Sequence, residues 1–161
     1  CPTLNPYASS KYAGEDLCRM YSTLYGLHTT ILRYFNVYGD RQHTTGQYAP
    51  VLGIFMKQRK EGLPLTVTGE GEQRRDFVHV SDVVDANILV AEKNTTPSRV
   101  YNVGSGVSYS IKEIANMISE NITYINERSG EVFATQAMIH QIGELGWEPQ
   151  VYLQDWIKDL S

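Results

Sequence analysis

The sequence predicts an α/β fold, because strand-like segments alternate with segments of helical periodicity along its 161 residues. Residues 28–35 are rich in β-branched and aromatic side chains, which is typical of a strand. They follow a helix predicted at residues 6–25, where apolar residues recur every three or four positions. Smaller elements after residue 46 indicate a second lobe, and we expect a ligand to bind between the lobes.

The ends of the first helix are marked in the sequence. Asn5 is a good capping residue, and Pro6 suits the first helical position. Gly26 supplies the left-handed conformation that commonly ends a helix. The strand after it leads into residues 36–46, which are rich in turn formers and are predicted to form a loop.

Glycines, prolines and capping residues delimit the remaining elements. Ser81 is expected to cap one helix, and Ser110 with Glu113 forms a capping-box pattern before another. The predicted helices cover residues 50–61, 81–93, 111–121 and 139–144 and the segment after residue 152. The predicted strands cover residues 65–68, 76–80, 100–103 and 122–125.

The composition excludes several functional classes. A formal net charge of −4 disfavours non-specific nucleic-acid binding, which needs a surplus of Lys and Arg. The apolar runs are too short for a membrane span, and the scattered histidines suggest no metal site. Cys1 and Cys18 match no metal or redox spacing, which favours a reducing, cytoplasmic location.

Tyr7 and Lys11 are four residues apart at the start of the first predicted helix, so their side chains share one face. An ammonium group held near a phenol stabilises the phenolate, which would make Tyr7 a general base for a sugar hydroxyl. The same spacing also arises between unrelated helix residues, and taken alone it does not separate the two interpretations.

Asn36 directly follows the strand at residues 28–35, and ligands of open α/β sheets collect at the carboxyl ends of strands. We therefore consider Asn36 a candidate donor to a ligand, although asparagine is used more often for its turn propensity.

Two adjacent arginines, Arg74 and Arg75, precede a strand in an acidic protein. Guanidinium groups can hold a phosphate with two hydrogen bonds, so a diphosphate is one candidate ligand and solvated surface charge is the alternative. His79 lies in an alternating strand, and a structural role is favoured over that of a base.

Taken in order, these segments resemble the extended short-chain dehydrogenase/reductases, specifically the nucleotide-sugar epimerase/dehydratase family, and within it the UDP-glucose 4-epimerases. The resemblance covers essentially the whole chain. It is carried by NPYASSK at residues 5–11, RYFNVYGDRQ at 33–42, RDFVHVSD at 75–82, NVGSG at 102–106 and LGWEP at 145–149.

The resemblance implies an α/β fold with the C-terminal part of a Rossmann-like parallel sheet plus a smaller mixed α/β substrate-binding lobe. Residues 1–46 would end the NAD-binding domain. Residues 47–161 would mainly form the substrate-binding lobe. Within them, residues from about 76 to 103 would belong to the Rossmann domain again. The chain begins abruptly at Cys1, so the family's glycine-rich loop and catalytic Ser or Thr would precede it. We therefore expect this stretch alone to bind NAD poorly and to be inactive.

The resemblance also assigns roles on the cofactor side. Tyr7 would remove the sugar hydroxyl proton, and Lys11 would hold the nicotinamide ribose. Phe35 would lie against the nicotinamide of NAD.

On the substrate side, the resemblance implies contacts with a UDP-sugar. Asn36, Arg75 and Arg128 would hold the diphosphate. Gln47 and the strand around Val67 would lie near the nucleotide.

The implied reaction is NAD-dependent epimerisation of a UDP-sugar at C4 through a transient 4-keto sugar. A nucleotide-sugar 4,6-dehydratase or decarboxylase of the same family is one alternative, and a truncated, non-catalytic interaction module is another. The first helix belongs to the pair that joins such enzymes as a four-helix bundle, so a homodimer is expected for the whole protein.

Overall fold

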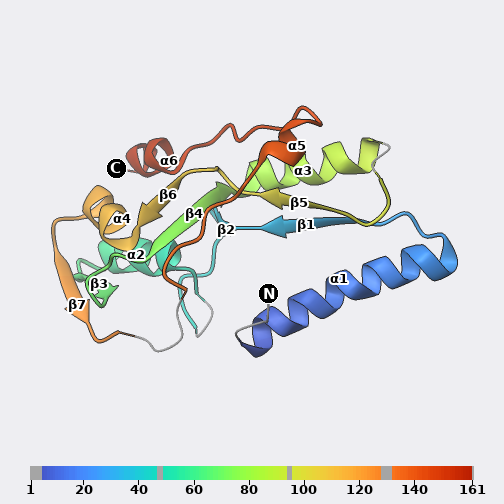
Figure 1. Cartoon of the computed structure of the whole chain (residues 1–161). Helices are drawn as coiled ribbons and strands as arrows, with labels where there is room; N and C mark the ends of the chain where they lie inside the picture. Colours follow the sequence, from blue (N-terminus) through green and yellow to red (C-terminus); the bar gives the residue numbers. More distant parts are fainter. Residues whose placement is uncertain (1–4, 47–48, 94–95, 128–131, 161) are drawn as a thin grey trace.

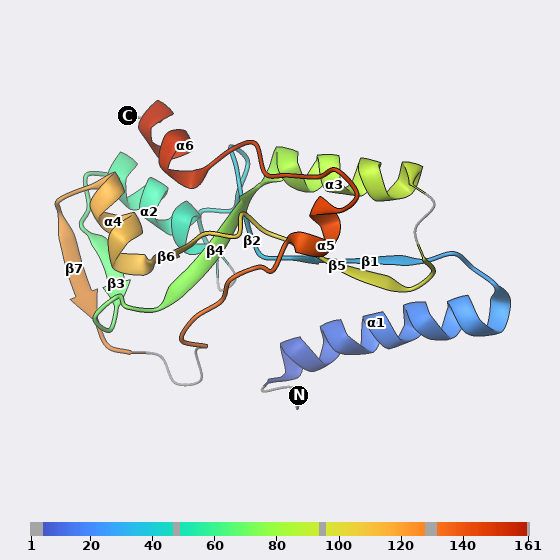
Figure 2. The ribbon, with the colours of Figure 1, turned by 45° about the horizontal axis from the view of Figure 1, so that its top comes forward.

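A parallel pair of strands lies between two helices in the computed structural model, which describes residues 5–46, 49–93, 96–127 and 132–160. Strands β1 (Thr30–Tyr34) and β5 (Arg99–Val103) pair in parallel. Helix α1 (Pro6–Tyr25) runs along one side of the pair, and α3 (Val80–Glu92) covers the other (Figures 1 and 2). Apolar side chains of α3 and β5 form one buried cluster, which fixes α3 to the strands.

The chain then crosses into a second sheet. After β1 it continues as β2 (Asn36–Tyr38), which pairs in parallel with β4 (Arg74–His79). After β5 it continues as β6 (Ser108–Ser110), which pairs antiparallel with the other edge of β4. Strand β4 is therefore the central strand of a three-stranded sheet. Its two edge strands, β2 and β6, continue the chain from β1 and β5 of the first sheet.

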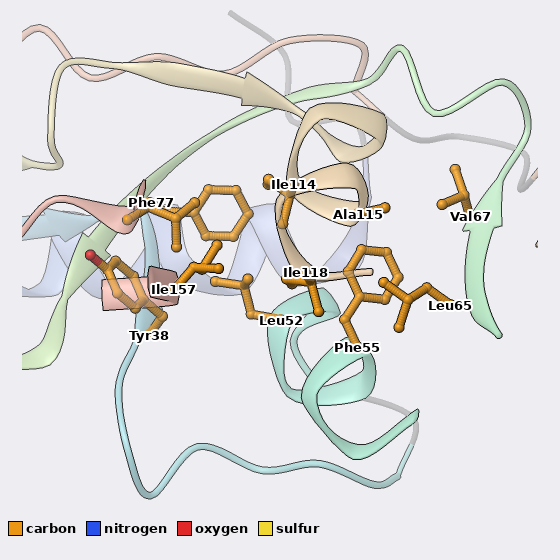
Figure 3. Packing of buried hydrophobic residues seen from close by; sticks show 11 residues of the cluster. Tyr38, Leu52, Phe55, Leu65, Val67, Phe77, Ile114, Ala115, Ile118 and Ile157 are labelled. Carbon is orange, nitrogen blue, oxygen red and sulfur yellow. The ribbon is translucent and has the colours of Figure 1, made fainter. Parts of the chain in front are cut away.

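The larger of the two clusters of buried hydrophobic residues packs against this sheet. It packs helices α2 (Val51–Lys60), α4 (Ile111–Ile118) and α6 (Leu153–Asp159) against β3 (Leu65–Thr68), which pairs in parallel with β7 (Ile122–Ile125). Figure 3 shows the aromatic and aliphatic side chains that interdigitate there. The buried residues are Tyr38, Leu52, Phe55, Leu65, Val67, Phe77, Ile114, Ala115, Ile118, Leu153 and Ile157.

Hydrogen bonds attach the C-terminal segment to α3 and to β2. It contains the short helix α5 (His140–Gly143) and reaches α6 over the start of α3 (Figure 2). Asp82 of α3 is buried and accepts from the backbone of Val151, and the indole of Trp147 donates to the backbone oxygen of Asp82. Tyr38 donates its hydroxyl to the backbone oxygen of Val151, and burial raises the pKa of this phenol, which keeps the donor protonated.

The structure confirms the α/β class, the parallel strands and most of the predicted elements. Asn5 caps α1 by accepting from the backbone of Ala8, and Gly26 ends it with φ 66°. The capping box of Ser110 and Glu113 is formed in both directions at the start of α4. The bond from the Ser110 backbone amide lowers the pKa of Glu113, against a smaller effect of burial.

Several boundaries differ from the sequence prediction, and strand β6 was not predicted. The predicted loop at residues 36–46 begins with β2, because the backbone of these residues pairs with β4. Ser81 is not the cap of α3; His79 takes this place, and its Nδ1 accepts from the backbone amide of Ser81. Helix α4 ends at Ile118 rather than near residue 121, because Asn121 already turns into the pairing of β7 with β3.

The proposed division of the chain at residue 46 stays a prediction. In the structure the central sheet combines β2 from before this residue with β4 and β6 from after it. Within the described residues, no helix is both long and apolar enough to cross a membrane.

Replacing Ser110 by Ala should lower the free energy of unfolding by about 1 kcal/mol, because the amide of Glu113 then loses its side-chain partner. Urea denaturation measures this loss. Ser119→Ala at the opposite end of α4 is the matched control, because Ser119 accepts only in an exposed turn from Asn121. Equal stabilities of the two variants would contradict a capping role for Ser110.

Candidate active site

Tyr7 and Lys11 lie together at the exposed start of α1. The Lys11 Nζ is 5.2 Å from the centroid of the Tyr7 ring, and the Tyr7 side chain is 69% exposed. Pro6 and the Asn5 cap fix the helical backbone immediately before the pair. The structure thus brings together the two side chains that the sequence proposed as a catalytic pair, on a surface that a ligand can reach.

A charged clamp ties this helix to strand β1. The guanidinium of Arg33 donates to both carboxylate oxygens of Glu15, at 2.6 and 2.7 Å, and Arg19 donates to the same carboxylate at 3.1 Å. The hydrogen bond from Arg33 lowers the pKa of Glu15, against the effect of its burial, and the carboxylate in turn raises the pKa of Arg33. Glu15 is one turn after Lys11, so the clamp fixes the face of the helix that carries Tyr7 and Lys11.

Phe35 and Asn36 occupy the point where β1 gives way to β2. Phe35 is half-buried, and its backbone amide still donates to Val103 of β5 at 3.0 Å. The Asn36 Nδ2 donates to the backbone oxygen of Asp76 at 2.7 Å. This bond orients the Asn36 amide, whose Oδ1 and second N–H are the groups that could meet a ligand.

Asn36 and Arg75 line one cavity of about 220 Å³. Its other polar walls are Thr66, Thr68 and Gln73, and apolar side chains of α2, α4 and β7 complete it. The cavity brings together residues that are far apart in the sequence and were predicted to hold the same diphosphate. Its mixed lining suits a ligand with a flat apolar part and a charged part.

The adjacent arginines have different surroundings. Arg75 lines the cavity, and its Nη1 donates to the backbone oxygen of Phe133 at 3.3 Å. Arg74 pairs with Glu113 at 3.2 Å and donates to the backbone of Ser108, and it is not among the residues that line the cavity. Of the two, Arg75 is therefore the one placed to meet an anionic ligand.

Of the remaining residues predicted to contact the substrate, the structure describes Val67. Val67 is fully buried in the hydrophobic core, so its side chain cannot line the cavity, although its neighbours Thr66 and Thr68 do. The alternation of β3, with Leu65 and Val67 inward and the threonines outward, is a signal that could have identified these two walls. Gln47 and Arg128 lie outside the described residues.

Gln73 is a further cavity residue that the sequence interpretation missed. Its Nε2 donates to the backbone oxygen of Thr68 at 3.4 Å. Its buried Oε1 has no hydrogen-bond partner within the described part of the chain. A buried acceptor without a partner is costly, so this oxygen is a candidate contact for a ligand N–H or O–H.

His79 has the structural role that the sequence favoured. Its Nδ1 is hydrogen-bonded to Ser81, and its ring meets the edge of Tyr38 with centroids 5.2 Å apart. No group of His, Cys, Asp and Glu that could hold a metal ion occurs in the portion of the chain that the structure describes.

Residues 1–104 match the NAD dependent epimerase/dehydratase family. The chain is also 38% identical to the putative UDP-glucose 4-epimerase of Methanocaldococcus jannaschii, over 96% of this chain and 52% of that protein. The chain belongs to this family. The family uses NAD. The matched residues include Tyr7 and Lys11, Phe35 and Asn36 where β1 leads into β2, and Arg75.

Two further comparisons place the chain within the family. The dTDP-D-glucose 4,6-dehydratase of Mus musculus is 30% identical over 96% of this chain and 46% of that protein. The crystal structure of the UDP-glucose 4-epimerase of Thermotoga maritima with UDP-glucose matches with a TM-score of 0.89 and 36% identity, covering 95% of this chain and 51% of that one. The chain therefore spans about half the length of the relatives it matches.

The charged clamp between α1 and β1 should show a defined pH dependence. The folded state lowers the pKa of Glu15 below its usual value near 4.5, so its contribution to stability is complete above that value and is lost as the pH falls through the lower, folded pKa. Glu15→Gln should therefore lower the melting temperature at neutral pH, and the difference from wild type should vanish in acid. Thermal unfolding at a series of pH values measures it.

Asp16→Asn is the matched control for this clamp, because the Asp16 side chain also pairs with Arg19 but is 58% exposed and, within the described residues, forms no ion pair with β1. It should change the melting temperature little at any pH. A Glu15→Gln variant that loses the same stability at acidic and neutral pH would contradict the clamp.

Proposed function

We propose that the whole protein catalyses the NAD-dependent epimerisation of a UDP-sugar at C4 through a transient 4-keto sugar. The observation that carries this proposal is the joint placement of Asn36 and Arg75 in one cavity, at the end of the strand to which the Tyr7–Lys11 helix is tied. Membership of the family supports the cofactor, and the epimerase relatives support the reaction.

Arg75 and Asn36 are proposed to bind the diphosphate. The planar guanidinium of Arg75 can donate two parallel hydrogen bonds to phosphate oxygens, which gives specific anion binding in a protein of net charge −4. The free N–H of the Asn36 amide can add a third donor. Arg128 remains a proposed diphosphate contact, and Gln47 a proposed contact near the nucleotide.

The inner part of the cavity is proposed to hold the pyrimidine. Its apolar walls suit the faces of the ring, whereas Thr66, Thr68 and Gln73 offer hydroxyl, backbone and amide groups to its polar edge. Val67 would contribute through the backbone of its strand rather than through its buried side chain.

Tyr7 is proposed as the base that takes the proton from the sugar C4 hydroxyl and later returns it. The exposed phenol and the ammonium of Lys11 share one helix face, so both can reach the same hydroxyl of a bound ligand. Tyr7, Lys11 and Phe35 fit the cofactor, because hydroxyl and ammonium donors suit ribose oxygens and an aromatic ring suits the nicotinamide face. When bound, NAD supplies the acceptor, and then the donor, of the C4 hydride.

The same residues would serve a 4,6-dehydratase or a decarboxylase of the family, since both begin with oxidation at C4. Their additional acid and base groups are not among the described residues of the site. The dehydratase relative keeps this alternative open, and the product of the reaction separates the three activities.

A homodimer through α1 is also proposed. None of the residues of α1 is buried, and it exposes large apolar side chains that a partner helix could cover. The exposed side chains are Tyr7, Tyr12, Leu17, Met20, Tyr21, Leu24 and Tyr25. We propose a cytoplasmic location, in keeping with the free thiol of Cys18.

The proposed activity is tested by incubating the whole protein and NAD with UDP-glucose and, in a parallel reaction, with UDP-glucuronate, and identifying the sugar products by NMR. UDP-galactose is the expected product. A 4-keto-6-deoxy sugar would assign the dehydratase reaction instead, and loss of carbon dioxide from UDP-glucuronate would assign the decarboxylase. Absence of both conversion and UDP binding would leave the non-catalytic interaction module.

Replacing Tyr7 by Phe should reduce turnover by roughly a thousandfold, because the phenolic proton acceptor is lost while the ring remains. The affinity for UDP, measured by calorimetry, should stay close to that of wild type. Tyr12→Phe, on the same helix and also exposed, is the matched control and should keep full turnover. Retained turnover in Tyr7→Phe would refute the assignment of Tyr7 as the base.

A further inference from the structure

Asp76 is fully buried in β4, and its carboxylate is held by hydrogen bonds from two other segments of the chain. Its Oδ1 accepts from the backbone amide and the hydroxyl of Ser105, at 2.7 and 2.9 Å. Its Oδ2 accepts from the backbone amides of Gly106 and Ala137, at 3.0 and 2.9 Å. Charge-assisted bonds of this kind compensate a carboxylate for the loss of water.

The two segments that Asp76 holds are the neighbours of Arg75. The turn at Ser105 and Gly106 leads into β6, where Tyr109 lies opposite Arg75 in the antiparallel register. The segment that ends at Ala137 contains Phe133, whose backbone oxygen accepts from the Arg75 Nη1. The Asp76 carboxylate therefore holds the turn that leads into β6, opposite Arg75, and the segment whose Phe133 backbone oxygen accepts from Arg75.

Gly104 packs closely against the carboxylate and against Ala137. A Cβ added at Gly104 would lie 2.4 Å from the Ala137 Cβ and 3.1 Å from each carboxylate oxygen of Asp76. Gln136 donates to the backbone oxygen of Gly106 at 2.7 Å, which joins the two held segments directly. The turn, the carboxylate and the segment at Ala137 thus form one closely packed unit.

We propose that Asp76 is a positioning residue for nucleotide binding, which keeps Arg75 and, through its own backbone oxygen, Asn36 aimed at the cavity. Asp76 acts through these residues and does not touch the substrate. The inference rests on the proposed function, because it assigns Asp76 to the same diphosphate site.

The test is calorimetric titration of the whole protein with UDP. Asp76→Asn keeps the shape of the side chain, but its NH2 group must face an N–H donor, so the two segments lose part of their attachment. We expect the dissociation constant for UDP to rise by about tenfold while kcat changes much less than KM.

Asp82→Asn is the matched control, because Asp82 is also buried and accepts a backbone N–H, but from Val151 in the C-terminal segment. It should lower the melting temperature and leave the affinity for UDP unchanged. An effect of Asp76→Asn on stability alone, with wild-type affinity for UDP in the folded variant, would overturn the positioning role and leave the proposed function intact.

Two further outcomes are distinguishable. A wild-type protein that does not bind UDP would reject the proposed function, and the role of Asp76 with it. An Asp76→Asn variant that does not fold is replaced by Ser105→Ala, which removes one of the donors to the carboxylate and leaves the charge in place. A weaker affinity for UDP in folded Ser105→Ala supports the proposal, and an unchanged affinity overturns it.

Discussion

The buried carboxylate of Asp76 is the constraint on which the rest of the arrangement depends. It binds the turn between β5 and β6 and the segment at Ala137, while the backbone oxygen of the same residue orients Asn36. A buried carboxylate that lost these donors would carry a large desolvation penalty, so the three segments are held to one geometry. The two segments that the carboxylate holds adjoin Arg75, which lines the cavity. The attachment of these segments and the proposed orientation of Arg75 and Asn36 therefore share one cause.

The site arises where the chain passes between the two sheets. Strand β1 carries the clamp to the Tyr7–Lys11 helix, and its continuation β2 begins with Asn36 beside β4 (Figure 1). A strand that belongs first to one sheet and then to the other places Phe35, the proposed cofactor contact, directly next to Asn36, the proposed substrate contact. The fold thus ties the helix that carries the proposed proton acceptor to β1, and the proposed anion-binding cavity begins at the first residue of β2.

Much of the local structure could be predicted from the sequence, because caps and turns are local interactions. Asn5, Gly26 and the Ser110–Glu113 pair mark helix ends as expected. Strand β2 could not be predicted, because Asn36 and Gly39 read as turn formers and the pairing with β4 is long-range. For the site, the motifs identified Tyr7, Lys11, Asn36 and Arg75 as a group. They did not reveal that the Val67 side chain faces the core or that Gln73 lines the cavity, since these depend on the packing of β3 and on contacts between distant segments.

In the proposed reaction, the hydrogen at the sugar C4 is removed and then returned to the same carbon. The most direct measurement follows this hydrogen, using UDP-glucose labelled with deuterium at C4, the whole protein and NAD. We predict UDP-galactose that keeps the deuterium at C4. Deuterium at C6 of a dehydrated sugar, or its exchange into water, would contradict the account.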